Sequence, residues 1–170
     1  MFPGGNIIRV RPTLSTNAYA QGDVLFVETE IPNAVSSRGG VAILEAAYVL
    51  DLADDGGNDA TIIFSEKNTT AIGTINETAD ISAENFAAND IIGVAIIDAS
   101  AGSTGTKIDN LRMNPIMPIT GEQEQSSAPL ILKAADGSTS VYFSGILTSG
   151  TTPIFAADDL QFIFHIKYLG

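Results

Sequence analysis

The 170-residue chain contains no cysteine and no tryptophan, and His165 is its single histidine. The lack of cysteine excludes disulfides, thiol nucleophiles and thiolate metal sites. A serine nucleophile needs a base and an orienting acid, only His165 is available as the base, and no G-x-S-x-G motif is present. A lone histidine of this kind is usually a surface residue. The sequence therefore predicts a protein that is not an enzyme and uses no cofactor.

Basic residues are also scarce, with 8 Lys and Arg against 20 Asp and Glu and a net charge of −12. Such a surface repels phosphate backbones and anionic lipids, so we expect no nucleic-acid partner and no membrane partner. No apolar run approaches the roughly 20 residues of a membrane span. The first residues lack a basic start and an apolar core, so no signal peptide is expected.

The clearest pattern in the chain lies in residues 159–169. Alternate positions are large and apolar, which is typical of a half-buried strand; they are Leu160, Phe162, Phe164, Ile166 and Tyr168. A strand with such a face needs a sheet to lie in and a second layer to cover it. An all-β body completed by this strand is the expected architecture.

Residues 41–52 fit two structures. Their Ala, Leu and Glu content gives good helix propensity, whereas apolar residues at every even position from Ala42 to Leu52 suit one face of a strand. The turn residues at 54–58 and the short apolar run at 61–64 favour a hairpin, and therefore a strand. Helix remains the alternative.

Further short strands are expected wherever apolar or β-branched runs lie between turn residues. They cover 7–11, 23–30, 69–75, 91–97, 130–132 and 141–147. The run at 91–97 is continuously apolar, as a fully buried strand would be. The strand at 141–147 is expected to return from 130–132 as a hairpin across the Asp136-Gly137 turn. Residues 82–88 suit one or two helical turns, with Ser82 as the cap.

The fold class that follows is all-β: a β-sandwich or jelly-roll-like domain with roughly eight to ten short strands and at most one short helix. The chain is expected to form a single domain over 7–170, preceded by a flexible arm at 1–6.

Two segments raise functional questions. Asp51, Asp54, Asp55, Asn58 and Asp59 supply enough oxygens for a calcium ion, but their spacing differs from an EF-hand and a hairpin tip explains them equally well. Residues 113–127 hold two prolines and fit no strand ladder. Their apolar part either packs on the core or lies on a neighbouring subunit, where adaptable methionine is useful.

Several phrases of the sequence resemble small virion-associated proteins of tailed bacteriophages. They are IRVRPTL at 8–14, AYAQGDVL at 18–25, IPNA at 31–34, GGVAIL at 39–44 and AADGSTSVY at 134–142. The resemblance implies a capsid decoration or cement protein, which would be a β-sandwich, a trimer and a ligand of the major capsid protein on the outer capsid surface. The contact segments expected are the arm with the first strand and the start of the proline-containing segment. Their residues are Phe2, Ile7, Ile8, Met113, Pro115, Ile116, Met117, Pro118 and Ile119.

Two other functions stay open at this point. A host-recognition or carbohydrate-binding module would need exposed tyrosines to stack on sugars, and the absence of tryptophan counts against it. A hydrolase would have to be built from His165 or the aspartate cluster.

Overall fold

The computed structural model describes residues 4–52, 58–82, 87–98, 106–108, 111–118, 129–148 and 152–169. Within these residues the chain forms ten strands and one helical turn at Ala87-Ala88, which confirms the all-β class. The strands are β1 (Gly5–Val10), β2 (Val24–Ile31), β3 (Val41–Asp51), β4 (Ala60–Ser65), β5 (Ile91–Ile97), β6 (Thr106–Ile108), β7 (Leu111–Pro118), β8 (Leu130–Lys133), β9 (Val141–Leu147) and β10 (Leu160–Tyr168).

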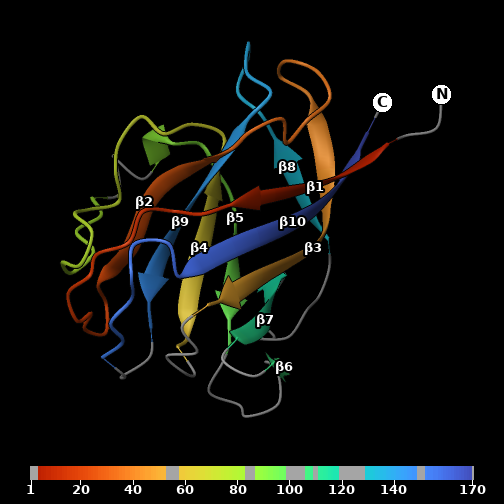
Figure 1. Cartoon of the computed structure of the whole chain (residues 1–170). Helices are drawn as coiled ribbons and strands as arrows, with labels where there is room; N and C mark the ends of the chain where they lie inside the picture. Colours follow the sequence, from red (N-terminus) through yellow and green to blue (C-terminus); the bar gives the residue numbers. More distant parts are fainter. Residues whose placement is uncertain are drawn as a thin grey trace.

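The strands form two antiparallel layers that cross one another in Figure 1. One layer, called here the β10 sheet, has the order β1-β10-β3, with β8 paired to the first half of β3 and β7 to the second half. The other, the β9 sheet, has the order β2-β9-β4-β5. At one side β7 also pairs with the end of β5 and so joins the layers. The result is a sandwich closed along one side.

β10 shows why this sequence forms two layers. Its alternate residues are buried, as expected, and two of them, Phe162 and Phe164, are fully buried. They meet Phe143 of β9 with ring centroids 4.9 and 5.0 Å apart. Phe26 and Phe64 complete a five-ring cluster between the sheets. Edge-to-face packing of such rings adds to the gain from burying their area.

Residues 41–51 form a strand, which confirms that choice over a helix. The even positions do not share one face, however. The pairing of β3 with β10 skips Glu45 between Leu44 and Ala46, which is a β-bulge. Before the bulge the buried residues are even-numbered, and after it they are odd-numbered, from Ala47 to Asp51. The bulge therefore turns the later even positions of β3 away from the core.

Both expected hairpins are wrong. β3 belongs to the β10 sheet whereas β4 belongs to the β9 sheet, and β8 and β9 are divided in the same way. The Asp136-Gly137 turn is present, but the chain crosses there from one layer to the other. A turn signal fixes where a strand ends; it does not fix which sheet takes the next strand.

Three further expectations need correction. Residues 69–75 form no strand, and only Ile75 makes an isolated bridge, to Val24. β5 is only partly buried rather than fully buried. Residues 113–118 lie in β7 and therefore in a ladder, although their prolines argued against a strand: Pro115 pairs with Tyr48 of β3, and Pro118 pairs with Ala95 of β5. Residues 119–127 lie outside the described part.

The N-terminal boundary also differs from the expectation, because β1 begins at Gly5 and so takes in the last two residues of the expected arm. Residues 1–3 lie outside the described part. Residues 83–86 of the expected helical segment do so as well.

The described residues of the long connection between β4 and β5, 66–82 and 87–90, lie over the outer face of the β9 sheet. Ile63 and Val24 are buried yet stand apart from the main core, together with Ile72 of the connection. Gly73 lies so close to Val24 that a Cβ at this glycine would fall 2.9 Å from Val24 Cγ2. A second, smaller apolar cluster therefore lies under this connection, as is usual beneath long loops.

Candidate functional site

The outer face of the β10 sheet is the main candidate. Cross-strand register places Arg9, Ile163, Tyr48 and Pro115 in one row over β1, β10, β3 and β7. Four strands about 4.8 Å apart make such a row roughly 14 Å long. The next outward row holds Ile7, His165 and Ala46, and the row beyond it holds Gly5, Lys167, Ile43 and Ile131. The face is thus a broad surface rather than a single exposed residue.

Large apolar side chains on this face reach solvent. Ile131 of β8 is 60% exposed and Ile7 of β1 is 49% exposed. Ile43, Tyr48 and Leu50 of β3 are half-buried. Tyr48 and Leu50 face outward because the Glu45 bulge reverses the alternation of β3. The bulge thus supplies part of the surface.

The two outer faces of the sandwich differ. Residues 66–82 and 87–90 lie over the β9 sheet, where Ser144 is only 2% exposed. No segment among the described residues covers the β10 sheet in this way, and its outward side chains are exposed or half-buried. Contiguous exposed apolar surface of this kind commonly marks an interaction site.

The charge of this face also differs from that of the whole chain. Arg9, Lys133 and Lys167 lie on it, against one acidic residue, Glu45, among the described strand residues. The chain as a whole has 8 basic and 20 acidic residues. A locally basic surface on an acidic protein has a preferred orientation towards a charged partner.

The structure brings together part of the expected contact set. Ile7, Met113 and Pro115 all lie on the outer face of the β10 sheet. Ile8 and Ile116 instead face the core, at 8% and 4% exposed, so they hold the strands in place rather than offering a free surface. Pro118 is half-buried at the join between the sheets. The side chain of Met117, and Phe2 and Ile119 entirely, fall outside the described part.

Sequence reasoning missed the residues of β3, β8 and β10 on this face. The alternation in 159–169 predicts which side of that strand is buried, whereas Ile163 lies on the opposite side. Ile131 looked like an ordinary residue of a short strand. The one available signal was that apolar residues occur on both faces of β3 and β10.

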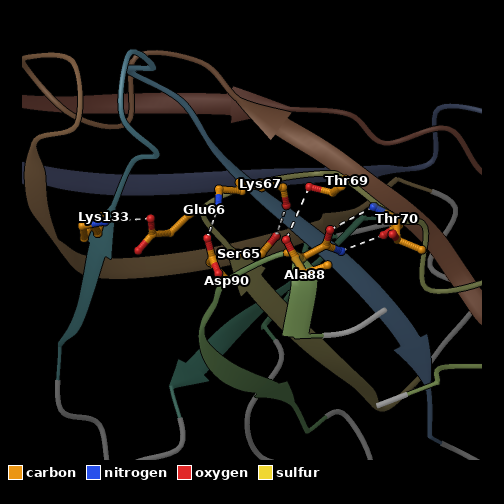
Figure 2. Close-up of polar contacts among 9 residues, drawn as sticks. Ser65, Glu66, Lys67, Thr69, Thr70, Ala88, Asp90 and Lys133 are labelled. Carbon is orange, nitrogen blue, oxygen red and sulfur yellow. Dashed lines mark hydrogen bonds and ion pairs between the residues drawn. The ribbon is translucent and has the colours of Figure 1, made fainter. Parts of the chain in front are cut away.

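A second candidate is a charged hollow of about 270 Å³ lined by Glu66, Lys67, Asp90, Lys133 and Asp136. Figure 2 shows that Lys133 reaches Glu66, at 2.7 Å, and that Lys67 pairs with Asp90. These hydrogen-bonded pairs raise the pKa of both lysines. Both lysines therefore stay protonated and paired, so neither of them is a free base or nucleophile.

The side chain of Asn89 links two parts of the connection over the β9 sheet by hydrogen bonds. This side chain is 1% exposed, accepts the Thr70 N–H at 3.0 Å and donates to the Thr70 carbonyl at 2.6 Å. Both polar ends of the amide are therefore satisfied. The two contacts close residues 70–89 into a loop.

Replacing Asn89 with alanine is expected to lower the free energy of unfolding by about 1–3 kcal/mol, because it leaves the N–H and the carbonyl of the half-buried Thr70 without their partner. Urea unfolding measures the change, and hydrogen exchange at Thr70 and Ile72 should quicken. Thr69→Ala is the control, since the exposed Thr69 hydroxyl makes only a 3.4 Å contact with Ala88. Equal stability of both variants would contradict the role of Asn89.

Glu28 of β2 holds the same connection from the other side, because its carboxylate accepts the Ile72 N–H at 3.1 Å. Burial raises the pKa of Glu28 above its ordinary 4.5. The folded chain thus holds the proton more tightly than the unfolded chain. The stability that this group contributes is complete below pH 4.5 and is lost as the pH rises through the raised pKa.

Glu28→Gln keeps the acceptor for Ile72 and removes the titration. We expect the stability of the variant relative to wild type to increase as the pH rises from about 4 to about 8, and then to level off. Urea unfolding across this range, on both proteins, isolates Glu28 from the other carboxylates. A difference that is constant over the whole range would refute the assignment.

The remaining titratable groups form no catalytic arrangement within the described residues. His165 lies on the outer face of the β10 sheet with its ring 5.6 Å from that of Tyr48. No group of three metal-ligating side chains is found among the described residues. Asp54 and Asp55 of the expected calcium cluster lie outside them. Near Asp51 and Asn58 the structure has a cavity of about 20 Å³, large enough for one water molecule.

Comparisons with models of known protein families, with curated proteins and with solved structures found no match. None of the described helical residues forms a helix long and apolar enough to cross a membrane.

Proposed function

We propose that this chain is a structural virion protein of a tailed phage, which decorates the outer capsid surface and cements it by binding between subunits of the major capsid protein. The observation that carries the proposal is the outer face of the β10 sheet. It exposes Ile7 of β1 and Ile131 of β8, and it also holds Met113 and Pro115 of β7, on the far side of β3 from β10. The sequence segments that resemble phage virion proteins are the reason for proposing a phage capsid as the binding partner.

The mechanism in this proposal is mechanical. Apolar area removed from water contributes about 25 cal/mol per Å², and this energy resists separation of the subunits that the protein bridges. The protein acts as a trimer, which multiplies the contacts of one decorating unit. The acidic remainder of the chain faces solvent and keeps the particle soluble.

Copy number per virion tests this function directly. Quantitative mass spectrometry of purified particles should find the chain at hundreds of copies, in fixed ratio to the major capsid protein. A few to a few tens of copies would place it at a vertex, neck or tail. Absence from purified particles would refute a virion role altogether.

A host-recognition or carbohydrate-binding module is the second candidate, and half-exposed Tyr48 on the same face favours it. The other tyrosines support it less. Tyr19 is buried, and the Tyr168 hydroxyl donates to the Asn33 carbonyl at 2.8 Å. Binding on a glycan array that is lost in Tyr48→Ala would favour this alternative.

A further inference from the structure

Arg9 and Lys167 are the free cations of the outer face of the β10 sheet. Both are exposed, and among the described residues no ion pair involves either of them. Lys133, by contrast, is already neutralised by Glu66. An exposed cation that forms no ion pair with the described residues is available to an anion of another molecule.

These two cations border the apolar part of the face. Arg9 lies on the edge strand β1, at the end of the row that continues through Ile163 and Tyr48. Lys167, close to the C-terminal end of β10, lies between Gly5 and Ile43 in the row that ends at Ile131. An apolar centre with charge at its border is the usual anatomy of a specific protein interface.

A second copy of the chain is a poor occupant in a face-to-face arrangement. A twofold contact places identical patches together, so Arg9 and Lys167 would meet a surface whose one acidic strand residue is Glu45. Like charges brought together at an interface weaken binding. The complement of this face is an acidic border.

Resting on the proposed function, we infer that the outer face of the β10 sheet binds an apolar protein surface bordered by carboxylates on the shell, with Arg9 and Lys167 pairing with those carboxylates. Charges more than about 8 Å apart are largely screened at physiological salt. The two cations therefore attract the carboxylates that they touch, and the net charge of −12, which is spread over the whole chain, does not cancel this attraction. The acidic remainder disfavours every other orientation against such a shell.

The test uses purified particles that lack this chain, mixed with increasing amounts of the full-length protein, with the bound fraction measured by co-sedimentation. Arg9→Glu is expected to raise the Kd about tenfold. Arg38→Glu is the matched control, because it makes the same charge change at an exposed residue in the loop between β2 and β3, and should bind like wild type. Circular dichroism confirms that both variants fold.

A second pair tests the apolar centre. Ile131→Asp should also raise the Kd at least about tenfold, since it brings an unpaired carboxylate into the contact. Ile154→Asp is its control, because Ile154 is 58% exposed, almost as much as Ile131, but lies outside the strands of this face.

The possible results separate the inference from the function. If wild type binds and both members of each pair bind equally, the inference is wrong and the decoration role stands. If wild type does not bind at all, the proposed function fails. If sedimentation velocity shows a wild-type oligomer that Arg9→Glu dissociates, the occupant is a second copy and the inference is overturned.

Discussion

Replacing Phe143 with alanine is expected to lower the free energy of unfolding by about 3–5 kcal/mol, the range for a buried phenylalanine truncated in a packed core. Phe143 is fully buried at the centre of the ring cluster. The centroid of its ring lies 5.1 Å from that of Phe26, 6.4 Å from that of Phe64, 4.9 Å from that of Phe162 and 5.0 Å from that of Phe164. These neighbours come from three strands, β2, β4 and β10, in both layers, so none can move into the space without disturbing its own sheet.

Urea unfolding followed by circular dichroism measures this loss. Phe143→Leu should lie between the alanine variant and wild type, because leucine fills part of the cavity. Ile154→Ala, at an exposed position, should change stability by less than about 0.5 kcal/mol. A loss below about 1 kcal/mol for Phe143→Ala would show that the two layers do not depend on this cluster.

Adding a single methyl group at Gly145 is expected to destabilise the protein by about 1–3 kcal/mol, an effect of overpacking. A Cβ at this position would lie 2.6 Å from Cε1 and 2.9 Å from Cζ of Phe26. Phe26 is fully buried and packed between the rings of Phe143 and Phe162. The ring has no free space to move into, so the backbone of β9 has to shift instead.

A double-mutant cycle tests the cause. If the clash with Phe26 is responsible, Gly145→Ala should cost much less in a Phe26→Leu background than in wild type. Gly93→Ala is a useful comparison, because its Cβ would meet only the end of Leu130, at 2.7 Å from Cδ1. The leucine can rotate, and the loss should stay below about 1 kcal/mol. Additive effects of Gly145→Ala and Phe26→Leu would refute the steric explanation.

The sequence predicts strands well here and pairings poorly. The alternation in 159–169 identifies β10 and its buried face, because period-two burial is a local property. The partners of β10 are β1 and β3, which no local pattern specifies. The two hairpins fail for the same reason: a turn between layers and a turn within a sheet use the same residues.

The candidate site depends on register, and register lies beyond the local pattern as well. The even positions of β3 suggested one apolar face, and a one-residue bulge at Glu45 divides them between core and surface. Proline argued against a strand at 113–118, yet Pro115 lies opposite Tyr48 in a ladder. The scarcity of catalytic side chains, in contrast, was readable from composition alone.

The pairing of β1 with β10 also determines when the β10 sheet can form during synthesis of the chain. Asn6 and Tyr168, which share a hydrogen bond, are 162 positions apart in the chain. At a synthesis rate of about 5–20 residues per second, β1 waits on the order of ten to thirty seconds before its partner exists. During that interval Ile8 and Val10 have no sheet to pack in, and the β10 sheet lacks its middle strand. The nascent chain therefore carries apolar, β-forming segments without their partner strand until translation reaches β10, and chaperones that bind such segments are expected to raise the yield of folded protein.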